Sequence, residues 1–114
     1  MQVGFVSGEI FVRDYESQPF SFPLTHEDID MPRDELEKIL GDEEEHARIT
    51  TSLTLSDKNY GVGFGAFVSV SLGCKQSRKA TDRAAEIGLD LATEYVNDAY
   101  ERAEELAEAH GIGE

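Results

Sequence analysis

The chain has 114 residues, one cysteine, and 24 Asp and Glu against 10 Lys and Arg, which gives a formal net charge of −14. Its length suits one domain over residues 1–114, and its charge disfavours direct binding to nucleic acid or to an anionic membrane, both of which require clustered cations. A single cysteine excludes an intrachain disulfide, and the sequence has neither a signal-peptide pattern nor an apolar run of membrane length, so we expect a cytoplasmic protein.

Residues 1–24 have the composition of short strands. Apolar residues flank a turn signal at 7–8, and a second alternating segment follows a polar bend at 16–19. Pro19 and Pro23 have no N–H to donate to a sheet ladder, so we expect this segment to be an edge strand or an extended arm.

Residues 25–45 predict a short helix followed by a loop, both acidic. Pro32 suits the first turn of a helix over about 32–40, and Gly41 suits its end. Ten of the residues from 27 to 45 are Asp or Glu, and the simplest interpretation of this run is a solvated surface.

The strongest structural pattern is a β-hairpin with strands at about 47–56 and 61–74, joined near 57–60. Both segments alternate with a period of two, so each strand has one apolar face and one small, polar face. The apolar faces are formed by Ala47, Ile49, Thr51, Leu53 and Leu55 in the first strand, and by Val62, Phe64, Ala66, Val68, Val70, Leu72 and Cys74 in the second.

Residues 77–109 predict one long helix, with Ser77 as N-cap and Gly111 as its stop. Apolar residues recur at spacings of three and four, and Gly88 and Ala92 would allow the helix to approach the sheet closely. We therefore expect an α+β fold, in which an antiparallel sheet of three to five strands is packed by this C-terminal helix, with a short helix near 32–40.

The small, polar face of the second hairpin strand is the first candidate interaction surface. Its glycines lie inside a strand and not between a strand and a helix, which is the wrong place for a phosphate-binding loop. They more plausibly mark a flat surface covered closely by another layer, either the N-terminal strands or a partner molecule. The face comprises Gly61, Gly63, Gly65, Phe67, Ser69 and Ser71.

A cluster of cations stands at the start of the long helix, where the helix dipole disfavours positive charge. It holds four of the ten cations within nine residues: Lys75, Arg78, Lys79 and Arg83. These side chains either pair with acids at 82, 86 and 42–45, or form a site for a small anion, a nucleotide or an acidic partner.

Carboxylates follow one side of the same helix. Such a line is typical of a solvated helix face, but it could also imitate nucleic-acid phosphates and occupy the binding groove of a basic protein. The residues concerned are Asp90, Glu94, Asp98, Glu101, Glu105 and Glu108.

No set of residues identifies a catalytic or metal site. The histidines at 26, 46 and 110 stand far apart, Cys74 has no neighbouring base, and the turn His26-x-Asp28-x-Asp30 lacks further metal ligands. We expect no enzymatic activity, no metal and no cofactor.

Residues from about 50 to 109 resemble small phage and prophage proteins of unknown function. The resemblance is carried by the run Thr51-Ser-Leu-Thr-Leu, the turn at 58–61, the run Gly65-Ala-Phe-Val-Ser-Val-Ser-Leu and the long acidic helix. It implies a virus-encoded accessory protein in the host cytoplasm, binding itself or a host or viral protein through the long helix or the sheet face. The first alternative function is nucleic-acid mimicry against a basic protein of the host, and the second is anion or nucleotide binding at the cation cluster.

Overall fold

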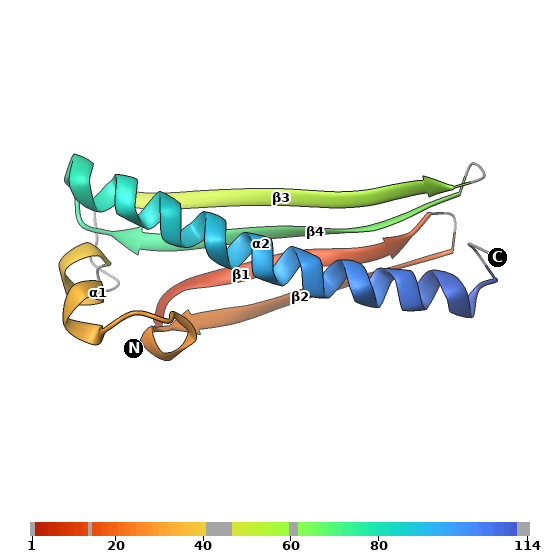
Figure 1. The fold of residues 1–114 in the computed structure, drawn as a ribbon, viewed down its shortest axis with the longest axis horizontal. Helices are drawn as coiled ribbons and strands as arrows, with labels where there is room; N and C mark the ends of the chain where they lie inside the picture. Colours follow the sequence, from red (N-terminus) through yellow and green to blue (C-terminus); the bar gives the residue numbers. More distant parts are fainter. Residues whose placement is uncertain (1, 14, 41–46, 60–61, 112–114) are drawn as a thin grey trace.

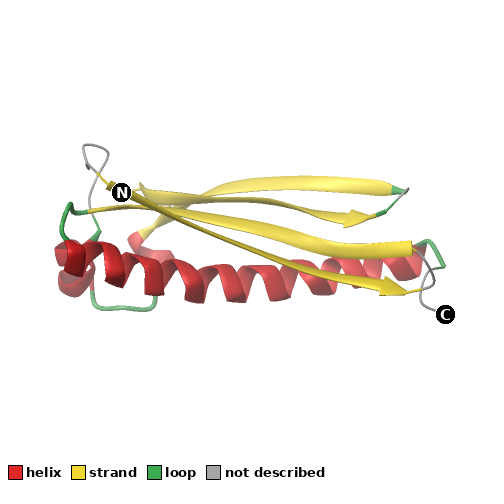
Figure 2. Ribbon diagram, turned by 90° about the horizontal axis from the view of Figure 1, so that it is seen from above, coloured by secondary structure: helices red, strands yellow, loops and turns green. Residues whose placement is uncertain are grey.

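A computed structural model describes residues 2–13, 15–40, 47–59 and 62–111. The elements in chain order are β1 (Gln2–Val12), β2 (Glu16–Thr25), the 3-10 helix η1 (His26–Asp28), α1 (Arg33–Ile39), β3 (Ala47–Asn59), β4 (Val62–Cys74) and α2 (Arg78–Ala109). The four strands form one antiparallel sheet in the order β2-β1-β4-β3. Helix α2 runs along the length of one face of this sheet (Figures 1 and 2), which confirms the expected α+β fold.

The hairpin and the two helices lie close to their predicted positions. Ser77 is the N-cap of α2, and its Oγ accepts a hydrogen bond from the Ala80 amide at 3.1 Å. Gly111 follows the helix with a φ of 78°, the left-handed conformation that favours glycine. β3 extends to Asn59, three residues beyond its predicted end. Gly41 and the tip of the hairpin lie outside the described residues.

The N-terminal region differs from the expectation of short strands, because β1 and β2 are both long. The predicted turn at 7–8 and the predicted bend at 16–19 lie within these strands, and the chain reverses between the end of β1 and the start of β2. β1 lies between β2 and β4, so it is paired on both sides and its backbone stays extended through Gly8. A Cβ at Gly8 would lie 2.1 Å from the Phe67 carbonyl oxygen, so this glycine permits close packing and does not form a turn.

The hydrophobic core lies between α2 and one face of the sheet. The register places the predicted apolar residues of β3, and those of β4 from Phe64 onward, on this face, together with alternate residues of β1 such as Val6 and Ile10. Gly88 approaches β3 closely, since a Cβ there would lie 3.0 Å from Thr51 Oγ1, and Ala92 is fully buried. The close contact predicted from these two small residues is confirmed.

The C-terminal part of α2 packs against the sheet of its own chain. Ala103 and Ala107 are buried, and the Tyr100 ring stacks on Phe64 with a centroid distance of 5.6 Å. The molecule measures 49 × 22 × 21 Å, and a helix of 32 residues is about 48 Å long. The helix therefore matches the full length of the sheet (Figure 1).

Candidate interaction surface

The face of the sheet opposite α2 contains the predicted surface of β4. Gly65, Phe67, Ser69 and Ser71 point to this side because their neighbours Ala66, Val68, Val70 and Leu72 are buried beneath the helix. One predicted alternative was that the N-terminal strands cover this surface. The strands do not lie across it. They extend the sheet sideways, with β1 paired to β4, since the apolar side of β1 is also buried beneath α2.

All four strands contribute to this surface, which we call the open face. Its members, from β2 to β3, are Pro23, Ser21, Pro19 and Ser17; Phe5, Ser7, Glu9 and Phe11; Ser71, Ser69, Phe67 and Gly65; and Arg48, Thr50, Ser52, Thr54 and Ser56. Glu9 and Arg48, one acid and one base, are the ionisable residues among them. No described helix covers this side, as Figure 2 shows. The open face is therefore broad and almost uncharged on a chain with a net charge of −14.

Short polar side chains on the open face are paired with one another across the strands. Ser52 Oγ donates to Ser69 Oγ at 3.2 Å, and Thr50 Oγ1 donates to Ser71 Oγ at 3.4 Å. Ser17 Oγ donates to the Glu9 carboxylate at 2.8 Å. Because these groups already have partners, a molecule that docks here need not satisfy each of them, which lowers the cost of removing water from the face.

Two phenylalanine rings stand out from this polar surface. Phe5 is 42% exposed and Phe67 is 36% exposed, so both rings can be buried further by a partner. The Arg48 guanidinium lies 5.6 Å from the centre of the Phe5 ring and donates a hydrogen bond to Ser71 Oγ at 3.1 Å. Aromatic and arginine side chains are enriched among the residues that supply most of the energy in protein interfaces.

A hollow of about 570 Å³ borders Phe67. It is lined on the open face by Ser7, Glu9, Pro19, Ser21 and Phe67. The hollow is shallow and open to solvent, and it adds a concave region beside the exposed Phe67 ring.

The glycines of β4 have a different physical explanation from the one predicted. A Cβ at Gly65 would lie 2.3 Å from the Leu55 carbonyl oxygen and 3.0 Å from the Phe11 ring, so Gly65 accommodates neighbouring strands of the same sheet. Gly63 is buried, and its carbonyl accepts a hydrogen bond from the Arg13 amide at 2.7 Å. Gly61 lies outside the described residues.

None of the open-face residues outside β4 was among the predicted site residues. Phe5, Ser7, Glu9 and Phe11 have the period-two spacing of a strand face, but the turn signal at 7–8 concealed this pattern. Pro19 and Pro23 differ by an even number, which places both on one side of the predicted edge strand. β2 is an edge strand, as the prolines predicted.

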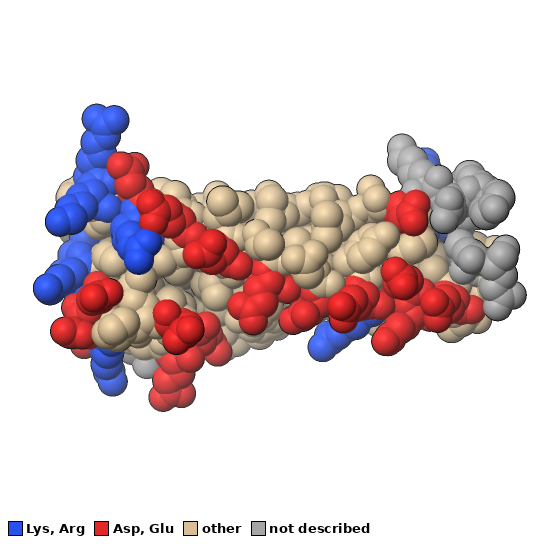
Figure 3. All heavy atoms as spheres, in the orientation of Figure 1, with Lys and Arg blue, Asp and Glu red and all other residues tan. Residues whose placement is uncertain are grey.

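The predicted cation cluster lies at the end of the molecule where α2 begins, and blue side chains gather there in Figure 3. Arg83 forms an ion pair with Glu86, as one alternative predicted. The hollow between α1 and α2, about 690 Å³, is lined by three cations and by three carboxylates: Lys38, Lys79 and Arg83, and Glu35, Asp82 and Glu86. This balance of charge does not favour an anion, and the acids at 42–45 lie outside the described residues.

Acidic side chains form a diagonal line along α2 in Figure 3, and the predicted acidic residues belong to this helix. All six are exposed: Asp90, Glu94, Asp98, Glu101, Glu105 and Glu108. We call this line the acidic stripe. Its residues are three or four apart, which places one carboxylate on this stripe every 5–6 Å or so along the helix axis.

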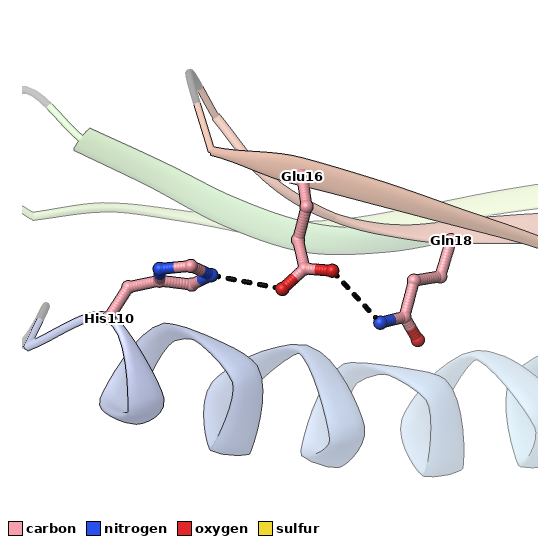
Figure 4. A network of polar contacts seen from close by, with 3 residues as sticks. All are labelled: Glu16, Gln18 and His110. Carbon is pink, nitrogen blue, oxygen red and sulfur yellow. Dashed lines mark hydrogen bonds and ion pairs between the residues drawn. The ribbon is translucent and has the colours of Figure 1, made fainter.

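His110 connects the end of α2 to β2, as Figure 4 shows. Its Nε2 lies 2.9 Å from Glu16 Oε1, and Gln18 Nε2 donates to Glu16 Oε2 at 3.0 Å. The hydrogen bond from His110, with a smaller contribution from Gln18, lowers the pKa of the Glu16 carboxyl below its ordinary value. The Tyr15 ring packs against His110 with a centroid distance of 4.8 Å. These contacts fasten the helix end to the sheet.

Among the described residues, no group of three or more His, Cys, Asp and Glu side chains is arranged to hold a metal ion. Cys74 is buried in the core. Burial raises the pKa of the Tyr95 hydroxyl, and its ring makes an edge contact with Phe22 at 5.3 Å, which is a packing arrangement. In the part of the chain that the structure describes, no helix is long and apolar enough to cross a membrane.

The chain was also compared with known proteins. Comparisons with protein-family models, with curated protein sequences and with solved structures find no match. The resemblance of residues 50–109 to small phage proteins stays a prediction. The candidate function is therefore argued from the surfaces of this chain.

Proposed function

We propose that this chain is a non-enzymatic interaction protein that binds a protein partner through the open face. The observation that carries the proposal is that one whole side of a four-stranded sheet has no described layer over it and almost no charge, on a chain with a net charge of −14. Sheets in folded proteins usually pack at least one face against another layer, and an antiparallel sheet can leave its second face in water. A solvated second face normally carries many charged side chains, whereas the members of this one include only Glu9 and Arg48.

The composition of the open face favours a protein as the partner. Phe5 and Phe67 supply exposed rings, the hollow beside Phe67 supplies a concave site, and paired hydroxyls supply a polar surround. This combination of aromatic anchors and satisfied polar groups is the usual anatomy of a protein interface. A nucleic-acid partner would require cations, and the open face has only Arg48 at its margin.

The decisive experiment replaces Phe67 by serine and measures capture of proteins from the cell in which the chain is made. Loss of one aromatic anchor is worth about 2 kcal/mol, which corresponds to a roughly 30-fold rise in Kd. Tyr15→Ser is the matched control, because Tyr15 is 55% exposed but lies outside the open face.

We expect one partner to be enriched by the wild type and by Tyr15→Ser and to be lost with Phe67→Ser. Thermal unfolding of both variants should remain cooperative, since both rings are substantially exposed. If Phe67→Ser retains every partner with unchanged affinity, the open face is not the binding surface.

A second candidate function is electrostatic imitation of nucleic acid by the acidic stripe. The observation that favours it is the unbroken line of exposed carboxylates along α2 (Figure 3), with Arg102 as the only cation in the C-terminal third of the helix. The charge density argues against a close imitation. Duplex DNA carries one charge per about 1.7 Å of its axis, roughly three times the density of the stripe.

Ionic strength separates the two candidates. A partner held by the acidic stripe should be released between low and moderate salt, because exposed charges are screened over about 8 Å at physiological ionic strength. A partner held by the open face should remain bound. Replacing Glu101 and Glu105 together by glutamine should weaken only a complex held by the acidic stripe.

A further inference from the structure

The two edge strands of the sheet differ in their ability to accept another strand. β2 and β3 are the outer strands, and β2 contains Pro19 and Pro23. β3 contains no proline, and its pairing with β4 shows no shift of register over 13 residue pairs. Proline is one of the devices that prevent an edge strand from pairing with another chain. Among the described edges, only β2 has this protection.

The backbone groups that β3 directs outward follow from one hydrogen bond and the register. The Arg13 amide donates to the Gly63 carbonyl at 2.7 Å, so the backbone N–H and C=O of Gly63 point toward β1. This direction alternates along an antiparallel strand, so the backbone N–H and C=O groups of the even-numbered residues of β4 point toward β3. They pair with odd-numbered residues of β3, as Val70 does with Thr51. The even-numbered residues of β3 therefore direct N–H and C=O away from the sheet: Arg48, Thr50, Ser52, Thr54 and Ser56.

The same reasoning locates the two prolines of β2. The even-numbered residues of β1 face β2, and Ile10, for example, pairs with Gln18. The odd-numbered residues of β2 therefore point outward, and both Pro19 and Pro23 are odd. Each proline removes an N–H at a position where an added strand would need one. The edge at β2 is thus closed to pairing, whereas the edge at β3 is open.

The flank of α2 beside β3 is apolar. Ile87 and Asp90 border a hollow against residues 27–32, on the opposite side of the helix from β3. Leu89 is rotated by about 200° from Ile87 around the helix axis, which turns it toward β3. Leu89 is 49% exposed, and Leu55 on the helix side of β3 is 37% exposed. Figure 3 shows this band, between the acidic stripe and the edge at β3, as largely free of charged side chains.

We propose that β3 pairs antiparallel with β3 of a second copy of this chain, around a twofold axis normal to the sheet. The two sheets of four strands become one continuous sheet, with both α2 helices on the same side. Thr50 then lies opposite Thr54 of the second copy, and the two Ser52 residues lie opposite each other. On the helix side, exposed Leu55 lies opposite Ile49 and next to Leu89 of the second copy.

Charge is compatible with this register. Arg48 lies opposite Ser56 of the second copy, and Asp57 lies opposite Ala47, so no like charges lie directly opposite each other over residues 47–57. A second copy complements this edge in polarity, because Ser and Thr lie opposite Ser and Thr on one face and exposed Leu55 lies opposite Ile49 on the other. The inference does not rest on the proposed function, since it concerns the edge of the sheet. Pairing of the two β3 strands would double the width of the open face.

The test introduces into β3 a proline like those that prevent β2 from pairing with another strand. Thr54→Pro removes one outward N–H from each copy, and Thr54 is exposed with no side-chain hydrogen bond to a described residue. Ser21→Pro makes the same kind of change at an outward position of β2, where the edge is already closed. Sedimentation equilibrium should give twice the chain mass of 12.6 kDa for the wild type and Ser21→Pro. We expect Thr54→Pro to raise the dimer Kd by about 100-fold or more.

Two results would overturn the proposal: a wild type that stays monomeric up to millimolar concentration, or a folded Thr54→Pro variant that dimerises like the wild type. If Thr54→Pro does not fold, amide hydrogen exchange of the wild type, measured by NMR, shows whether the edge at β3 is paired. The amides of Thr50, Ser52 and Thr54 should be protected at high concentration and lose protection on dilution. If they exchange as fast as the outward amide of Ser21, the edge is unpaired and the proposal fails.

Discussion

Gly65 and Gly88 offer a matched pair of substitutions, because one added methyl group meets a backbone carbonyl at the first position and a hydroxyl group at the second. At Gly65 the new Cβ would lie 2.3 Å from the Leu55 carbonyl oxygen and 2.8 Å from Ser56 Cα. A normal carbon–oxygen contact is about 3.3 Å, so the two strands would have to separate by roughly 1 Å. The ladder between β3 and β4 resists this movement along its whole length.

The expected energies follow from these contacts. Forcing backbone apart in Gly65→Ala should cost about 3 kcal/mol, and the lower entropy of the unfolded chain returns about 1 kcal/mol, which leaves a net loss near 2 kcal/mol. In Gly88→Ala the methyl lies 3.0 Å from Thr51 Oγ1, a contact that a small side-chain movement relieves. The gain in helix propensity of about 1 kcal/mol should offset that movement, so we expect a change within about 0.5 kcal/mol.

Urea unfolding at one fixed protein concentration measures both variants. Gly65→Ala should lower the unfolding midpoint without a change of slope, and Gly88→Ala should follow the wild-type curve. In thermal unfolding the difference between the variants should be about 8 °C. A Gly65→Ala protein as stable as Gly88→Ala would refute the close approach of β3 to β4 at this position.

Two further predictions concern the ends of α2. Ser77→Ala removes the acceptor for the Ala80 amide and should cost about 1 kcal/mol of unfolding free energy in urea, whereas Ser77→Asp should restore most of it; equal stability of all three proteins would show that the cap is not energetically important. His110→Ala should raise the pKa of Glu16 toward its ordinary value, measured by NMR titration of its carboxyl carbon. Because the folded pKa of Glu16 is lowered, its contact stabilises the protein above the ordinary carboxyl pKa, and this contribution is lost as the pH falls through the lowered value. An identical titration in both proteins would contradict the contact with His110.

The elements that carry a local period were predictable from the sequence. The alternation in 47–74 and the spacing of three and four in 77–109 each depend on which residues of one segment share a face, and a single segment contains that information. The caps at Ser77 and Gly111 are also local, because they satisfy groups within one helical turn. The acidic stripe is predictable for the same reason.

The lengths of β1 and β2 were not predictable from local signals. Ser7 and Gly8 form a turn signal in isolation, but β1 is held extended by partners on both sides, and Gly8 is needed where the Phe67 carbonyl approaches. These contacts join residues about 60 positions apart in the chain. Propensity describes a segment without its neighbours, and pairing in a central strand overrides it.

The sequence by itself determined the period and polarity of the hairpin strands and of the long helix, and the two ends of that helix, since these depend on neighbouring residues. Only the tertiary structure decided where the N-terminal strands lie. By placing β1 beside β4, and not across it, the fold leaves the open face without a second layer and makes β3 an outer strand. The physical reason is that the strands have apolar side chains on one face only, and a single helix of matching length covers that face. The opposite face and the edge at β3 therefore stay available for a partner.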